Sequence, residues 1–169
     1  MPFKGWDLRA VHTPGHTAGH LCFHEAEREL LFSGDHILPR ITPNISAHTA
    51  GPQDPLSDFL GTFDALRALD VHEVLPAHEF RFAGLRARLD DLERHHAERL
   101  AELLAVVDAA PGTPAWDIAP RLTWSRPWPE ITEMMRRAAV GETLSHLLRL
   151  RTQGRVRVAG DEPMRWYPA

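Results

Sequence analysis

The chain has 169 residues and a formal net charge of −4 at pH 7. Its hydrophobic fraction of 43% and charged fraction of 25% are ordinary for a soluble globular protein. The sequence contains no apolar run long enough to cross a bilayer and no secretory signal pattern, so we expect no membrane partner. The single cysteine, Cys22, excludes an internal disulfide and favours the reducing cytoplasm as the compartment.

Charge and histidine are distributed unevenly along the chain. Residues 1–79 hold five Lys or Arg against eleven Asp or Glu, whereas residues 80–169 hold fourteen against twelve. Eight of the eleven histidines precede residue 80. An acidic, histidine-rich first half is suited to a cation site, and a solvated acidic face is the alternative.

The first half of the sequence predicts short strands separated by polar loops. Period-two alternation and short apolar runs predict four strands, over 6–11, 21–23, 30–32 and 71–75. A proline-rich loop is expected over 39–55, followed by a helix that begins at Asp54-Pro55 and extends to Leu69. Three strands, a helix and a further strand are the element order of an α/β layer.

The second half changes to a helical period. Helices are expected over 85–107, 113–122 and 130–152, and a β-hairpin over 155–167. Three helices followed by a hairpin predict a winged-helix-like domain. We therefore expect two domains, over 1–84 and 85–169.

Three predicted strands run into tight loops that carry potential metal ligands. His16 follows Pro14-Gly15, Asp35 follows Gly34, and His78 follows Pro76-Ala77. Loops at strand ends gather at one edge of an α/β sheet, and imidazole and carboxylate ligands are suited to Zn, Fe or Mn. Each of the three alone is more typical of an ordinary turn residue. Together they favour a metal site.

These loops resemble the metal motifs of the metallo-β-lactamase superfamily. The string His12-Thr13-Pro14-Gly15-His16-Thr17-Ala18-Gly19-His20 resembles the third motif, Gly34-Asp35-His36 the fourth, and Pro76-Ala77-His78 the fifth. The tail from about Leu85, with Glu142-Thr143-Leu144-Ser145-His146-Leu147, resembles a winged-helix domain appended in one branch of the superfamily.

The resemblance implies a fold and a metal centre. The fold class is α/β (α+β): the C-terminal half of an αββα sandwich followed by a winged-helix-like domain. The family binds two metal ions, usually Zn, and hydrolyses a wide range of substrates. By position, His16 would bind one ion, His78 the second, and Asp35 would bridge both and act as the catalytic residue. The family's main motif, His-x-His-x-Asp-His, does not occur in this sequence. The chain alone is therefore expected to bind metal weakly and to be a poor catalyst.

Three functions remain open from the sequence. The first is a metal-dependent hydrolase of a small-molecule ester or thioester. The second is a nuclease, for which the surplus of nine Arg over six Asp or Glu in residues 113–169 is modest. The third is a non-catalytic module that binds the missing N-terminal half or a second copy of the chain. His20 and His36 either orient a metal ligand or are packing residues, and His96 and His146 are expected to be hydrogen-bonded core histidines.

Overall fold

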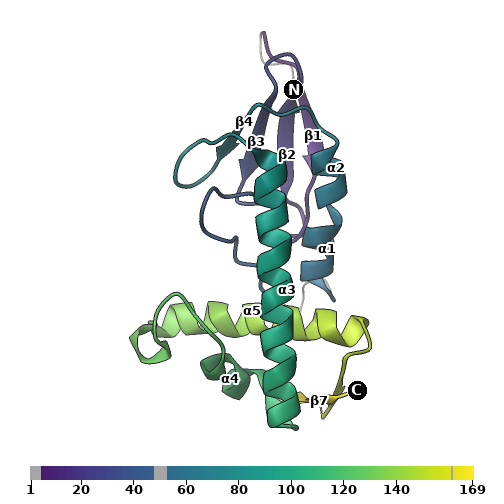
Figure 1. Cartoon of the computed structure of the whole chain (residues 1–169), viewed down its shortest axis with the longest axis vertical. Helices are drawn as coiled ribbons and strands as arrows, with labels where there is room; N and C mark the ends of the chain where they lie inside the picture. Colours follow the sequence, from purple (N-terminus) through teal and green to yellow (C-terminus); the bar gives the residue numbers. More distant parts are fainter. Residues whose placement is uncertain (1–4, 48–52, 161) are drawn as a thin grey trace. The chain divides into compact units, whose positions relative to one another are not determined.

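The structure is a computed structural model of the chain (Figure 1). It describes residues 5–47, 53–160 and 162–169, so part of the proline-rich loop predicted over 39–55 lies outside the described residues. Two compact units are present: Met1–Pro43 with Ser57–Arg94, and Asn44–Leu56 with His95–Ala169. The division into domains over 1–84 and 85–169 stays a prediction.

The first unit contains a four-stranded mixed sheet. Its strands are β1 (Leu8–His12), β2 (Leu21–Glu25), β3 (Leu30–Gly34) and β4 (Glu73–Pro76). The spatial order is β1-β2-β3-β4, with antiparallel pairing up to β3 and parallel pairing between β3 and β4. Helices lie between the two parallel strands in sequence, as such a crossover requires. The four predicted strands and the mixed α/β class are confirmed.

The two faces of this sheet differ in burial. Cys22, Leu31 and Val74 point to one face and are fully buried. Leu21 and Phe23 point to the opposite face and remain 42% and 39% exposed. The alternation follows from the two-residue period of a strand. One face of the sheet is therefore packed within the unit, and the other still carries accessible apolar side chains.

The helix expected over 54–69 is two short helices, α1 (Pro55–Gly61) and α2 (Phe63–Arg67), so the prediction of one continuous helix is wrong. The break lies at Thr62. Its backbone N–H and its hydroxyl both donate to the carbonyl oxygen of Phe59, at 3.2 and 2.7 Å. A hydroxyl that donates a hydrogen bond to a backbone carbonyl oxygen in this way competes with the regular helical hydrogen bond.

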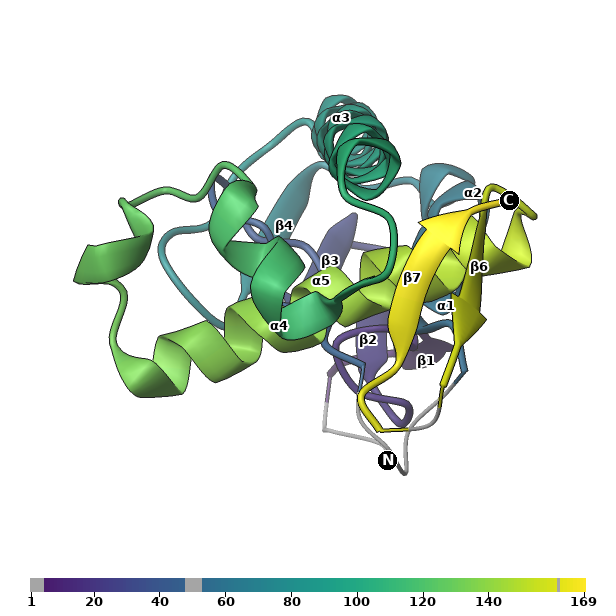
Figure 2. The ribbon, with the colours of Figure 1, turned by 90° about the horizontal axis from the view of Figure 1, so that it is seen from below.

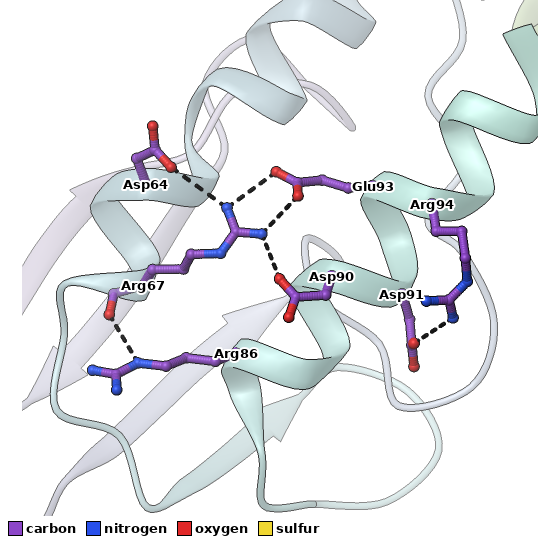
Figure 3. Close-up of polar contacts among 7 residues, drawn as sticks. All are labelled: Asp64, Arg67, Arg86, Asp90, Asp91, Glu93 and Arg94. Carbon is purple, nitrogen blue, oxygen red and sulfur yellow. Dashed lines mark hydrogen bonds and ion pairs between the residues drawn. The ribbon is translucent and has the colours of Figure 1, made fainter.

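An ion-pair network connects α2 to the start of α3 (Leu85–Ala109) within the first unit (Figure 3). The Arg67 guanidinium lies 2.7 Å from Glu93 and 2.7 Å from Asp90, both on α3. It also lies 3.4 Å from Asp64 on its own helix. Arg86 donates to the carbonyl oxygen of Arg67 at 3.2 Å. A fork-shaped guanidinium suits several carboxylates at once, which explains arginine at this position.

The second unit holds the remaining elements (Figure 2). They are β5 (Thr113–Pro114), α4 (Ala115–Ile118), the 3-10 turns Ala119–Arg121 and Trp128–Glu130, α5 (Glu133–Thr152), β6 (Val156–Ala159) and β7 (Arg165–Pro168). The predicted hairpin is confirmed, apart from Asp161, which lies outside the described residues. The single helix expected over 113–122 is wrong at its start, because Thr113 pairs with Trp166 as a third strand. The winged-helix interpretation stays a prediction.

The core of the second unit is mainly apolar, and the buried polar residues among those described include Thr143, Ser145 and the pair His96 and His146. Trp166 is fully buried with Leu103, Val107 and Leu147. Over the ranges that the structure describes, no helix has both the length and the apolar character needed to cross a membrane.

Candidate metal centre

Asp35 lies between the two histidines that the sequence singles out. His78 Nε2 is 3.1 Å from Asp35 Oδ1, and His16 Nε2 is 3.9 Å from Asp35 Oδ2. The side chains of Asp35 and His16 are each 32% exposed, and that of His78 is 67% exposed. Each carboxylate oxygen therefore faces a different imidazole. The structure brings all three candidate residues together, and their role as metal ligands remains a prediction.

A tight loop after β1 holds His16. The loop is closed by a hydrogen bond from Thr13 N–H to the His20 carbonyl oxygen at 2.9 Å. Gly15 has φ +136°, and a Cβ at this position would lie 2.5 Å from Cβ of Phe59. Both the backbone conformation and the close approach require glycine. The Pro14-Gly15 turn therefore fixes the position of the His16 backbone.

The Asp35 turn follows directly from β3. Gly34 has φ +54°, in the left-handed region that favours glycine. His36 N–H donates to the Ser33 carbonyl oxygen at 3.0 Å, and the Ser33 hydroxyl donates to the Ile37 carbonyl oxygen at 2.8 Å. These bonds hold the turn on both sides of Asp35.

The His78 loop is attached to this turn and to a second loop. Ala77 N–H donates to the Gly34 carbonyl oxygen at 2.8 Å. Glu79 has φ +69° and receives a hydrogen bond from Arg40 Nε at 3.0 Å. A second nitrogen of Arg40 lies 2.9 Å from the same carboxylate oxygen. The ion pair explains how an exposed His78 keeps its position beside Asp35.

His20 and His36 lie next to the centre as a stacked pair, with ring centroids 5.5 Å apart. His20 Nδ1 is 2.8 Å from Thr13 Oγ1, and His36 Nε2 is 2.8 Å from Thr62 Oγ1. Burial lowers the pKa of His36 to about 3, and burial followed by the charge of His16 lowers the pKa of His20. Both rings are therefore neutral near pH 7.

The donor chemistry of this centre suits zinc, but the number of donors is small. Zinc sites typically use His nitrogen and carboxylate oxygen at roughly 2.0–2.2 Å, so neighbouring ligand atoms lie roughly 3–4 Å apart. The two distances around Asp35 fall in this range. Within the described part of the chain, no group of three or more His, Cys, Asp or Glu side chains is arranged to hold one ion. The described residues therefore supply fewer donors than a complete zinc position needs, and Asp35 lies between the two imidazoles.

Several residues that position the centre cannot be recognised from the sequence alone. Arg40 and Glu79 carried no recognisable signal, because their pairing joins two loops that are far apart in the sequence. Thr13 and Thr62 were also not predicted, although hydroxyl side chains near the ligand motifs are reasonable partners for histidine rings.

The family model described as the metallo-beta-lactamase superfamily matches residues 2–78. A metallo-beta-lactamase family protein from Thermus thermophilus is 34% identical, with a TM-score of 0.86 over all of this chain and 52% of that protein. A beta-lactamase domain protein from Burkholderia ambifaria is 30% identical, with a TM-score of 0.89 over all of this chain and 50% of that protein. The chain belongs to the metallo-β-lactamase superfamily.

Curated relatives are more distant and much longer. Lactamase-like protein aptB of Emericella nidulans is 29% identical over 105 residues, which are 62% of this chain and 31% of that protein. An atrochrysone carboxyl ACP thioesterase of Aspergillus fumigatus is 31% identical over 87 residues, which are 52% of this chain and 19% of that protein. The chain spans about half the length of these solved structures and less than a third of these curated relatives.

Proposed function

We propose that this chain forms the C-terminal part of a metal-dependent hydrolase, with His16, Asp35 and His78 as its share of the metal centre. The observation that carries the proposal is the position of Asp35, whose two carboxylate oxygens face two different imidazoles. A carboxylate in this position is suited to bridging two ions. The family to which the chain belongs supports the same interpretation.

Zinc is the metal that we propose, with two ions in the complete centre and iron or manganese as alternatives. Bound zinc would lower the pKa of a water molecule to near neutrality and polarise the bond to be cleaved. His16 would contribute to one position, His78 to the other, and Asp35 to both. Catalytic zinc positions typically have three protein ligands. The further ligands must therefore come from outside the described residues.

We propose a small-molecule ester or thioester as the substrate. The relative from Aspergillus fumigatus whose name identifies it as an acyl-carrier-protein thioesterase supports a thioester over other bonds. Nuclease activity is not favoured, because the arginine surplus of residues 113–169 is small.

The sheet face that carries Leu21 and Phe23 is accessible, which supports the proposal that a partner binds there. Leu21 and Phe23 lie on that face and are exposed, and exposed apolar patches of this kind mark interaction sites. The solved relatives are about twice as long as this chain. The partner we propose is the N-terminal half of the superfamily domain, and a second copy of the chain is the alternative.

The test is an activity assay on a longer form in which the N-terminal half of the superfamily domain precedes this chain. With zinc, the longer form should hydrolyse a chromogenic thioester far faster than the 169-residue chain. A chelator should remove the activity, and Asp35→Asn should abolish it. His72→Ala, a control that removes a histidine just before the start of β4 and not at the end that carries His78, should leave it unchanged. Chelator-resistant hydrolysis that survives Asp35→Asn would contradict the proposal.

A further inference from the structure

A chain of hydrogen bonds leads from the buried face of the sheet to the His20 ring. Cys22 Sγ lies 3.5 Å from the carbonyl oxygen of Ser33. Thr13 Oγ1 lies 3.3 Å from Cys22 Sγ and 2.8 Å from His20 Nδ1. Thr13, Cys22 and Ser33 are fully buried, so water does not compete for these groups.

The Ser33 carbonyl oxygen, at the buried end of this series of hydrogen bonds, determines the direction of each bond in the series. A carbonyl oxygen can only accept, so the Cys22 thiol donates to Ser33. Burial raises the pKa of Cys22 to about 11, which keeps the thiol protonated. The one hydroxyl proton of Thr13 then goes to Cys22 Sγ. Thr13 Oγ1 is left as an acceptor, so the ring proton must be on His20 Nδ1.

A neutral imidazole with its proton on Nδ1 has an unprotonated Nε2. In His20 this atom lies against the turn that precedes Asp35, because a Cβ added to Gly34 would be 2.6 Å from Nε2. Gly34 directly precedes Asp35, and the His20 ring stacks on that of His36, which directly follows Asp35, so the ring lies beside the candidate metal centre. The lone pair of Nε2 is therefore next to the residues that we assign to the metal.

We propose that His20 is a positioning residue of this centre and a fixed hydrogen-bond acceptor. Its Nε2 accepts from an O–H or N–H donor at the site and cannot donate to a carbonyl or carboxylate oxygen. This inference rests on the proposed function for its role at the centre. The assignment of the proton to Nδ1 depends instead on the hydrogen bonds described above and on the burial of Cys22, and not on any bound metal.

His36 provides an internal comparison, because the same reasoning gives it the opposite form. The Thr62 hydroxyl donates to the Phe59 carbonyl oxygen at 2.7 Å, so Thr62 Oγ1 accepts from His36 Nε2. His36 Nδ1 is then unprotonated, and in the described residues it is buried without a hydrogen-bond partner. Two stacked rings thus carry their protons on different nitrogens.

The test is long-range ¹H–¹⁵N spectroscopy of the metal-free 169-residue chain near pH 7, with resonances assigned from His20→Gln and His36→Gln. His20 should show a protonated Nδ1 and an unprotonated Nε2, and His36 the reverse. Thr13→Val removes the hydroxyl acceptor and should increase the Nε2-protonated form of His20. Thr13→Ser keeps the hydroxyl and should restore the wild-type spectrum. Thr62→Val should alter His36 and leave the His20 proton on Nδ1.

Zinc titration of the same variants tests the role at the centre. Thr13→Val should weaken zinc binding about 10-fold or more relative to Thr13→Ser, because it releases the His20 ring beside the proposed ligands, and changes in residues around metal ligands typically cost roughly 10–100-fold in affinity. A wild-type His20 with its proton on Nε2 would overturn the inference, as would equal zinc affinities for the two variants. A wild-type chain that binds no zinc would instead refute the proposed function, and the spectrum would still decide the proton position.

Discussion

His78 Nε2 lies 3.1 Å from Asp35 Oδ1, although the two residues belong to loops after different strands. Two contacts maintain this relationship. The Ala77 backbone N–H is bonded to the Gly34 carbonyl oxygen, and the Glu79 carboxylate is bonded to Arg40. The first contact is a backbone hydrogen bond and does not depend on particular side chains. The second requires the side chains of Arg40 and Glu79.

Arg40→Met should therefore weaken zinc binding while leaving the fold intact. The substitution removes the ion pair that holds Glu79, so the exposed His78 loses one of its two restraints. We expect a loss of affinity of several-fold, towards the lower end of the roughly 10–100-fold range for residues that orient metal ligands. Zinc titration against a competing chromophoric chelator measures it. Arg137→Met, in a different and exposed ion pair, is the control and should bind zinc like the wild type.

Gly34→Ala should destabilise the first unit. Its φ of +54° is unfavourable for alanine, and the added Cβ would lie 2.6 Å from His20 Nε2. We expect the free energy of unfolding to fall by about 1–3 kcal/mol, measured by urea denaturation. Gly61→Ala is the matched control, because nothing lies within 4 Å of a Cβ there. Equal stabilities for the two variants would show that the Gly34 turn is not constrained as described.

Arg67→Met should destabilise the protein more than a substitution that breaks an isolated surface ion pair. Hydrogen bonds from Glu93 and then Asp90 raise the pKa of Arg67 above its ordinary value, so its charge is constant at all accessible pH values. Because one guanidinium serves several carboxylates, we expect a loss of about 1 kcal/mol in the free energy of unfolding, smaller at high salt. Arg137→Met, which breaks one exposed pair with Glu133, should change it by less than about 0.5 kcal/mol. A larger effect at Arg137 would contradict the assignment.

Acid should destabilise the second unit through its buried histidine pair. His96 Nδ1 lies 3.0 Å from His146 Nε2, and both residues are 1% exposed. Burial, followed by the charge of the other histidine, lowers the pKa of His96 to about 2, and burial lowers that of His146 to about 4, from 6.5. Below about pH 6.5 the unfolded chain binds protons that the native rings do not. The stability present above pH 6.5 is therefore lost as the pH falls.

The expected slope is about 1.4 kcal/mol per pH unit for each imidazole, below the unfolded pKa. Burial raises the pKa of Glu142 to about 7, which stabilises the native state as the pH falls from 7 to 4.5 and so opposes the effect. Urea unfolding of the wild type and of Glu142→Gln between pH 7 and 4.5 measures both contributions. Glu142→Gln should lose stability more steeply, and an identical pH profile for the two proteins would count against this explanation.

The sequence predicted the elements that have a clear period and the residues that follow a sharp turn. The four strands of the first sheet and the closing hairpin were predicted from local alternation and short apolar runs, and His16, Asp35 and His78 from loops with glycine or proline. The break at Thr62 could not be predicted, because it depends on a hydrogen bond from the Thr62 hydroxyl to the Phe59 carbonyl oxygen, and the same hydroxyl could equally bond to water. The Arg40–Glu79 pair could not be predicted either, because nothing local indicates that two distant loops meet.

Zinc binding by the 169-residue chain, compared between wild type and Asp35→Asn, tests the central claim most directly. Asparagine keeps the size of the side chain and removes the carboxylate charge that faces His16 and His78. The account predicts weak but measurable binding by the wild type and a loss of more than about 10-fold in Asp35→Asn, with His72→Ala unchanged. Equal zinc affinity in the wild type and Asp35→Asn would show that the metal centre does not lie at Asp35.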